Sequence, residues 1–148
     1  MRNGFSMLMA IVIIVVISSI GAFVMNLSGK IVKETTTQYQ REQSMLLAKS
    51  YTEYAIMAVT ANEHNSSNCL NTINGTALGG HYTIRADITY MGRNFDSSCA
   101  RVIADDVATP KSPLNIIVDV YVRYQDPDHP AGSSAPWITY HKRTLQKI

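Results

Sequence analysis

An uncharged apolar segment almost at the start of the chain constrains everything that follows it. Residues 3–29 carry no formal charge, and no side chain between Met7 and Ile17 is polar. At about 1.5 Å per residue, a helix from Phe5 to Met25 would be roughly 30 Å long, which matches the hydrocarbon thickness of a bilayer. Because a helix satisfies its backbone groups internally, lipid can surround it. The sequence therefore predicts a membrane-spanning helix.

Two ordinary interpretations of such a segment are a plain membrane anchor and a secretory signal peptide that is later removed. A signal peptide normally ends in a small-x-small cleavage site, and the stretch Ser19-Ile20-Gly21 is a poor example of one. The helical pattern also continues beyond the apolar segment instead of breaking into a loop. These observations favour a helix that stays in the protein.

The residues Arg2-Asn3-Gly4-Phe5-Ser6, followed by the apolar segment, resemble the start of type IV pilins and of the pseudopilins of type II secretion and DNA-uptake systems. The resemblance implies that a prepilin peptidase cuts between Gly4 and Phe5 and methylates the new N-terminal Phe5. It implies a bacterial inner-membrane protein with a single span, whose head lies in the periplasm or on a fibre. The implied partners are other pilin or pseudopilin subunits, an assembly platform and its ATPase.

Met9 departs from the pattern of this family. Most members carry a glutamate at this fifth mature position, where it meets the N-terminal amine of a neighbouring subunit. A carboxylate in apolar surroundings is costly unless it is paired, so Met9 removes both a cost and a registering contact. Some minor subunits at the fibre tip lack the acid, and the resemblance therefore favours a minor or tip subunit. The alternative is a lineage that sets its register by another device.

Length and composition predict one anchor helix and one small head. The chain has 148 residues, of which 46% are hydrophobic and 16% are charged, and this leaves no room for two ordinary domains. We expect the following division: a prepilin leader (1–4), a transmembrane and assembly half of the helix (5–29), an amphipathic half (30–61) and a globular β head (62–148).

Both cysteines, Cys69 and Cys99, fall in the head. If the head lies in an oxidising compartment, the pair is expected to form a disulfide, worth roughly 3 to 4 kcal/mol for a loop of this size. A small head needs such a crosslink because its hydrophobic core is marginal. The alternatives are two buried thiols or a metal site, for which no further ligand spacing is recognisable.

The amphipathic half of the helix is expected to dock on the head. Residues at helical spacing form the predicted docking face: Leu47, Tyr51, Tyr54 and Ala58. Charged residues share the opposite side: Glu42, Lys49 and Glu53. We interpret that side as solvated, with salt bridges to neighbouring subunits as the alternative.

The head is predicted to consist of antiparallel strands. Alternating apolar and polar residues indicate strands over Tyr82–Tyr90 and Leu114–Tyr124, and a third strand is expected over Trp137–Leu145. A weaker signal covers Cys99–Ala104. A long helix followed by antiparallel strands is an α+β fold, and this arrangement matches the pilin head that the resemblance implies.

No pattern in the chain predicts an enzyme, a cofactor or a metal site. The four histidines stand in separate segments: His64, His81, His129 and His141. Two acidic pairs, Asp105-Asp106 and Asp126-x-Asp128, lack the spaced oxygen ligands of a calcium loop and are interpreted as solvated turns.

Nucleic-acid binding is not expected from the net charge of +2. The basic residues 141–143 would point to opposite faces of a strand, which favours a solvated edge over a phosphate site. Glu63-His64-Asn65-Ser66-Ser67 resembles the acceptor of some bacterial oligosaccharyl transferases, with Asn65 as the glycosylated residue, although so short a motif also occurs by chance.

The sequence thus favours a non-enzymatic, pilin-like structural subunit of a type II secretion, type IV pilus or DNA-uptake fibre. No motif distinguishes these three machines. The alternative from another class is a single-pass, signal-anchored periplasmic binding protein that is not incorporated in a fibre. A third hypothesis, DNA binding by the head, requires an affinity that depends on salt.

Overall fold

In a computed structural model, residues 3–62, 69–93, 95, 99–107 and 114–148 are described. The chain divides into two compact units, one ending at Tyr39 and one spanning Gln40–Ile148. The division falls inside helix α1 (Asn3–Ala61), so this one helix contributes its first part to one unit and its last part to the other. The helix contains no proline, which explains why its 59 residues run without a break.

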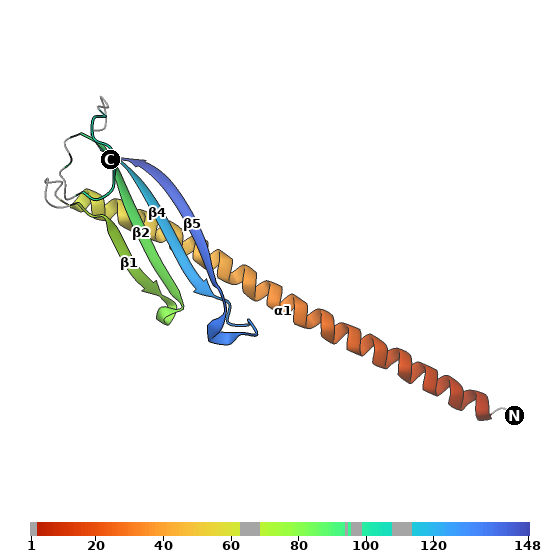
Figure 1. Ribbon diagram of the computed structural model, residues 1–148. Helices are drawn as coiled ribbons and strands as arrows, with labels where there is room; N and C mark the ends of the chain where they lie inside the picture. The colour runs from red at the N-terminus through yellow and green to blue at the C-terminus, as the bar shows by residue number, and fades with distance from the viewer. Residues whose placement is uncertain (1–2, 63–68, 94, 96–98, 108–113) are drawn as a thin grey trace. The chain divides into compact units, whose positions relative to one another are not determined.

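The second unit contains a sheet in which β1 (Thr72–Ala77), β2 (Tyr82–Gly92), β4 (Leu114–Gln125) and β5 (Trp137–Lys147) lie side by side in that order (Figure 1). These four strands are antiparallel to their neighbours. The short strand β3 (Val102–Ala104) pairs in parallel with the end of β2. The predicted α+β fold is therefore confirmed, with β3 as the one parallel addition.

The three strands predicted from alternation are confirmed as β2, β4 and β5, and β3 lies inside the weaker stretch Cys99–Ala104. Strand β1 was not predicted. Its sequence Thr-Ile-Asn-Gly-Thr-Ala has no run of alternating apolar residues, and asparagine and glycine are unfavourable in strands. Pairing with β2 along all six residues, from Thr72↔Asp87 to Ala77↔Tyr82, overrides that weak preference.

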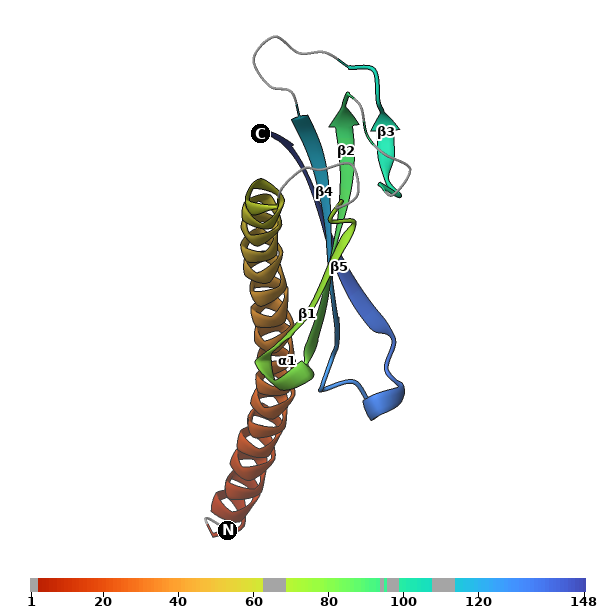
Figure 2. The same cartoon turned by 90° about the vertical axis from the view of Figure 1, so that its left-hand side faces the viewer.

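One face of the sheet carries the core of the second unit. Apolar side chains of β2 and β4 alternate with polar ones, and the apolar members pair across the strands, as in Ile84↔Val122 and Ile88↔Val118. The last part of α1 covers this face, and Figure 2 shows this part of the helix on one side of the sheet. The largest fully buried side chains include Ile84, Ile88, Ile116, Val118, Val120 and Val122.

The face of α1 that meets the sheet overlaps the predicted one only in part, because Leu47 and Tyr51 pack against the core but Tyr54 is exposed. The fully buried positions are each one residue further along the chain: Ala48, Thr52, Ala55 and Val59 in place of Leu47, Tyr51, Tyr54 and Ala58. Leu47, Tyr51 and Ala58 are only half-buried, and Tyr54 is exposed. The prediction followed the large side chains, whereas the branched residues of the sheet already fill the interface and leave room for small ones on the helix. The opposite side of the helix, with Glu42, Lys49 and Glu53, is exposed as predicted.

Gly75 in β1 lies against a side chain of the helix. A Cβ atom at this position would overlap the hydroxyl and the ring of Tyr51. The half-buried Tyr51 thus reaches past the small residues beside it and lies over the backbone of β1. A larger residue at this position would therefore displace the ring of Tyr51.

Candidate functional site: the apolar helix half and the outer sheet face

The first unit offers its apolar side chains without internal partners. Every large hydrophobic residue from Met7 to Leu27 is exposed within that unit, and Met9 is among them. Among the described residues, α1 is the one helix long and apolar enough to cross a membrane. Single-pass membrane anchoring is compatible with this helix because it provides both the length and the apolar surface.

Polar side chains in the first unit bond to their own helix. The hydroxyl of Ser19 donates to the carbonyl oxygen of Val15 (2.8 Å), and the amide of Asn26 donates to that of Ala22 (3.3 Å). The consecutive residues Thr35, Thr36 and Thr37 do the same, over 2.8 to 3.1 Å, each to the carbonyl four residues earlier. The hydroxyl donors therefore need no partner outside the helix, and the amide of Asn26 has one of its two N–H groups satisfied within it.

The predicted processing site lies at the first turn of α1, whose backbone is helical from Asn3. Nothing in the geometry tests cleavage between Gly4 and Phe5, methylation of Phe5 or the consequence of Met9, and these stay predictions. The predicted glycosylation site Asn65 and the histidine His64 lie outside the described residues.

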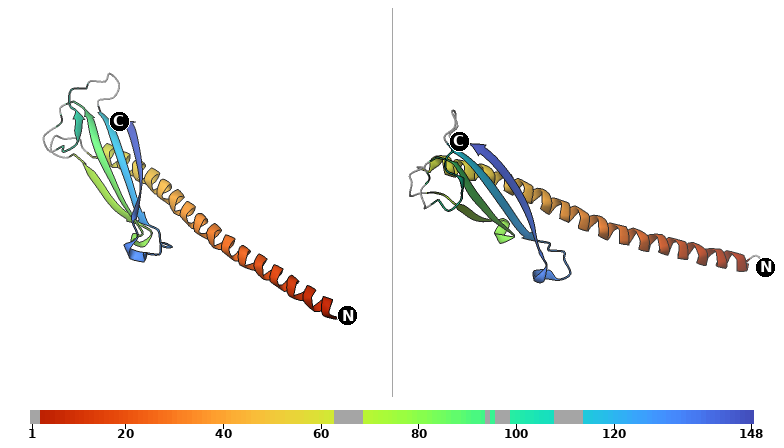
Figure 3. Two further views of the ribbon diagram at one scale, coloured as in Figure 1. Left: turned by 45° about the vertical axis from the view of Figure 1, so that its right-hand side comes forward. Right: turned by 45° about the horizontal axis from the view of Figure 1, so that its top comes forward.

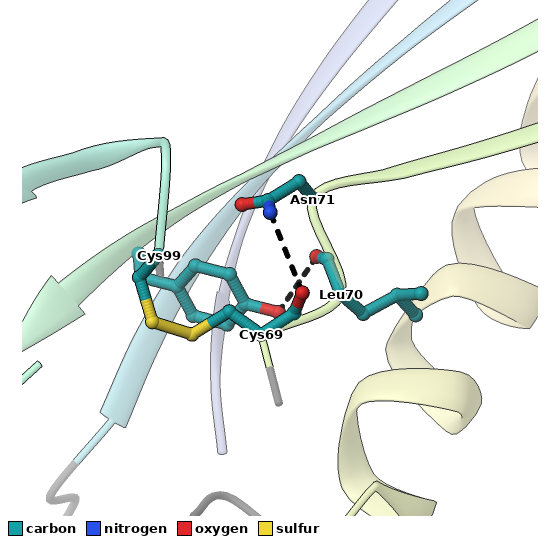
Figure 4. The surroundings of a disulfide bond; sticks show 5 residues. Cys69, Leu70, Asn71 and Cys99 are labelled. Carbon is teal, nitrogen blue, oxygen red and sulfur yellow. Dashed lines mark hydrogen bonds between the residues drawn. A yellow bond between two sulfur atoms is a disulfide. The ribbon is translucent and has the colours of Figure 1, made fainter. Parts of the chain in front are cut away.

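A disulfide joins Cys69 and Cys99, as predicted (Figure 4). It connects the segment that leads into β1 with the segment that leads into β3, two segments that lie on the same side of β2. The segment after Cys69 is also held by β2, because the amide of Ile88 donates to the carbonyl oxygen of Asn71 (3.0 Å). The crosslink therefore closes the end of the sheet where β1 begins.

Tyr90 of β2 supports the same corner from the core. Its hydroxyl donates to the carbonyl oxygen of Leu70 (2.8 Å), the residue next to Cys69. Burial raises the pKa of the Tyr90 hydroxyl, against a smaller lowering by this hydrogen bond. The neutral, donating form of the tyrosine is therefore favoured at physiological pH.

The sheet face turned away from α1 carries two buried carboxylates. Asp119 of β4 accepts two hydrogen bonds from the guanidinium of Arg143, Nε to Oδ1 (2.7 Å) and Nη2 to Oδ2 (2.9 Å). Nε2 of His141 lies 2.7 Å from Oδ1 of the same carboxylate, and the imidazole stacks on Tyr121 with a centroid separation of 4.5 Å. The hydrogen bonds from Arg143 lower the pKa of Asp119, and His141 adds to this against the opposing effect of burial.

Asp87 of β2 is the second carboxylate. It pairs with Nε of Arg85 (2.9 Å) and Nη1 of Arg101 (3.0 Å), and the hydroxyl of Thr72 donates to it (3.0 Å). Asp87 and Asp119 are direct cross-strand neighbours, an arrangement that repels unless it is compensated. The cationic partners on both sides provide the compensation, and we call this set the charged row: Arg101, Arg85, Asp87, Asp119, His141 and Arg143.

Sequence reasoning did not find the charged row. The signal was present, because His141 and Arg143 are two apart on β5 and so share one face. The split of the basic residues 141–143 over two faces is confirmed, since Lys142 pairs with Val120 of the core side. What was missing is the register that places Asp119 opposite Arg143.

The remaining predicted candidates stay apart from one another. The backbone amide of Asp128 donates to Oδ1 of Asp126 (3.0 Å) within one turn, and Asp106 forms an exposed ion pair with Arg93 (3.6 Å). The imidazole of His81 contacts the ring of Tyr82, and Nδ1 of His129 accepts from the amide of Ala131 (3.2 Å). Within the described parts of the chain, no three histidine, cysteine or acidic side chains come together as metal ligands.

The chain was compared with family models, with curated proteins and with solved structures. No family model matches it, and neither a curated protein nor a solved structure does. The architecture itself consists of a long N-terminal helix with an apolar half, whose last part packs on a largely antiparallel sheet, and of a disulfide in the head.

Proposed function

We propose that this protein is a non-enzymatic, pilin-like subunit of an envelope-spanning fibre of the secretion, pilus or DNA-uptake type, retained through its N-terminal helix. The observation that carries the proposal is the continuity of α1, which runs from Asn3 through the apolar half into the head without a break. A removable signal peptide has no need to be one helix with the folded domain. The disulfide supports a head in an oxidising compartment such as the periplasm.

Assembly in this proposal is a packing reaction. A prepilin peptidase cuts between Gly4 and Phe5, and the apolar side chains from Met7 to Leu27 exchange lipid for the helices of neighbouring subunits. Because lipid and protein are equally apolar, the gain comes from close packing and not from leaving water. Met9 supplies no carboxylate for pairing with a neighbour, which favours a minor or tip position over the repeating subunit.

Intact-mass measurement of the protein extracted from membranes tests this proposal. We expect the loss of residues 1–4 together with one added methyl group. The Gly4→Leu chain should remain uncut and have the mass of its full length, whereas the matched variant Gly29→Leu should be cut and methylated like the unsubstituted protein. An uncut chain in the unsubstituted protein, or cleavage beyond residue 20, would instead support the signal-anchored binding protein or a discarded signal peptide.

A further inference from the structure

The two edges of the sheet differ in length and in pairing capacity. Strand β5 forms one edge, and no strand of the described part of the chain lies on its outer side (Figure 3). It pairs with β4 through an uninterrupted register of eleven residues, from Asn115↔Lys147 to Gln125↔Trp137. Edge strands of monomers are usually short, bulged, interrupted by proline or lined with charged side chains. Strand β5 is long, regular and free of proline within its bounds, and of these protections it has only its basic side chains.

The ladder defines which backbone groups of β5 face outward. The amide of Ile148 donates to the carbonyl oxygen of Leu114, so the even-numbered residues of this strand direct their backbone groups toward β4. On β2, the amides of the even-numbered residues Ile88 and Tyr90 donate toward β1 and β3, so its odd-numbered residues face β4. These pair with odd-numbered residues of β4, which leaves the even-numbered residues of β4 facing β5, in agreement with the parity given above. The odd-numbered residues of β5 therefore present their backbone amides and carbonyls at the open edge: Trp137, Thr139, His141, Arg143, Leu145 and Lys147.

These outward residues are also the ones whose side chains lie on the sheet face away from α1, and all six are exposed. Two of them are large hydrophobic residues, Trp137 with 49% of its surface exposed and Leu145 with 64%. Three are basic or can become basic: His141, Arg143 and Lys147. The strand contains no acidic residue.

We propose that the open edge of β5 binds an extended segment of another protein by antiparallel strand addition, and that this segment carries acidic side chains at alternate positions. Residues of an added antiparallel strand that bond to the odd positions of β5 place their side chains on the same face as His141, Arg143 and Lys147. Acidic side chains there would meet the basic members directly. The side chain of Arg143 is 65% exposed although it holds Asp119, so part of its guanidinium remains accessible to a second carboxylate.

A second copy of this chain fits the edge less well. Pairing β5 with another β5 would bring the basic side chains of both strands together. On the opposite edge, β1, the carbonyl of the odd-numbered Asn71 points to β2, so the even-numbered residues direct their backbone groups outward. Within β1 these residues are Thr72, Asn74 and Thr76. These three residues carry no charge and span half the length, so β1 offers no complement to β5.

The test uses the full chain in detergent micelles with its disulfide intact, and Trp137 as reporter because it is the only tryptophan. The probe is an acetylated and amidated (Thr-Glu)5 peptide, with (Thr-Lys)5 as the matched control. We expect a saturable change in tryptophan emission with the acidic peptide and an affinity at least about tenfold lower for the basic one. Equal affinity for the two peptides would overturn the proposed chemistry of the partner.

Two further comparisons separate strand addition from simple charge attraction. Leu145→Pro removes an outward amide but no bond to β4, and it should weaken binding roughly fivefold relative to Leu145→Ala. Methylating the backbone nitrogens of all glutamates in the peptide should abolish binding, whereas methylating those of all threonines should preserve it. The reverse order, or a folded Leu145→Pro protein that binds normally, would contradict antiparallel addition.

Oligomeric state provides the last control. Sedimentation of the full chain in micelles without peptide should give the same state for the unsubstituted protein and for Leu145→Pro. An assembly of the unsubstituted chain that the proline dissociates would show that a second copy occupies the edge, and it would overturn the proposal. Neither result depends on whether residues 1–4 are cut, so this inference and the proposed function fail separately.

Discussion

The two parts of helix α1 handle apolar surface in opposite ways. In the first unit, large side chains such as Ile14 and Phe23 are exposed and have no partner within it. In the second unit, the same helix buries small side chains such as Ala48 and Ala55, and the sheet supplies the large ones. One helix thus combines apolar side chains that this unit leaves exposed with apolar side chains that the sheet of the same chain buries.

The largest expected effect concerns only the second unit. Replacing both Cys69 and Cys99 with serine should lower the free energy of unfolding of the head by roughly 3 to 4 kcal/mol, because the crosslink restricts the unfolded chain. Urea unfolding followed by near-ultraviolet circular dichroism measures this loss. Membrane association of the same variant should be unchanged, and its loss would mean that the two parts of the helix are not independent.

A charge placed in the first unit should have the converse effect. Val15→Lys puts an ammonium in the middle of the apolar segment, at a cost of about 2.5 to 3.5 kcal/mol in membrane insertion. Fractionation of cell membranes should show a reduced membrane-bound share. Ser50→Lys, an exposed position of the second part, is the matched control and should fractionate like the unsubstituted protein.

Substitutions on the buried and on the exposed face of the last part of the helix should differ in their effect on stability. Ala48→Leu adds bulk where no space exists and should destabilise the head by about 1 to 3 kcal/mol. Leu46→Ala, two residues away on the exposed side, should change stability by less than about 0.5 kcal/mol. Thermal unfolding in micelles compares them. Equal losses would mean that the exposed side of the helix contributes as much to the stability of the head as the buried face does.

The smallest expected effect lies on the outer face of the sheet. The pKa of Asp119 is lowered in the folded protein, so its stabilising contribution is complete above the unfolded carboxyl pKa of about 3.9 and disappears as the pH falls through the lower folded value. Asp119→Asn should therefore flatten the decrease in unfolding free energy below about pH 4. An unchanged acid profile would mean that the carboxylate gains nothing from Arg143.

Sequence reasoning found the features that repeat along one element and missed those that join two. The alternation in Tyr82–Tyr90 and Leu114–Tyr124 is local, and both strands are confirmed. The buried helix face was missed by one residue because it depends on how much of the interface the sheet fills. The charged row required the register of β4 with β5, and Gly75 required the reach of Tyr51. Neither relation is encoded within a single strand.

The threonine stretch of α1 has a consequence for how deeply the helix can sit in its surroundings. The hydroxyl groups of Thr35, Thr36 and Thr37 donate their protons within the helix. Moving these three residues from water into an apolar environment therefore breaks no hydrogen bond from their hydroxyl protons to water. The charged side chains just before this stretch, Lys30, Lys33 and Glu34, still favour water, so they and not the threonines limit how far the helix can move into an apolar environment.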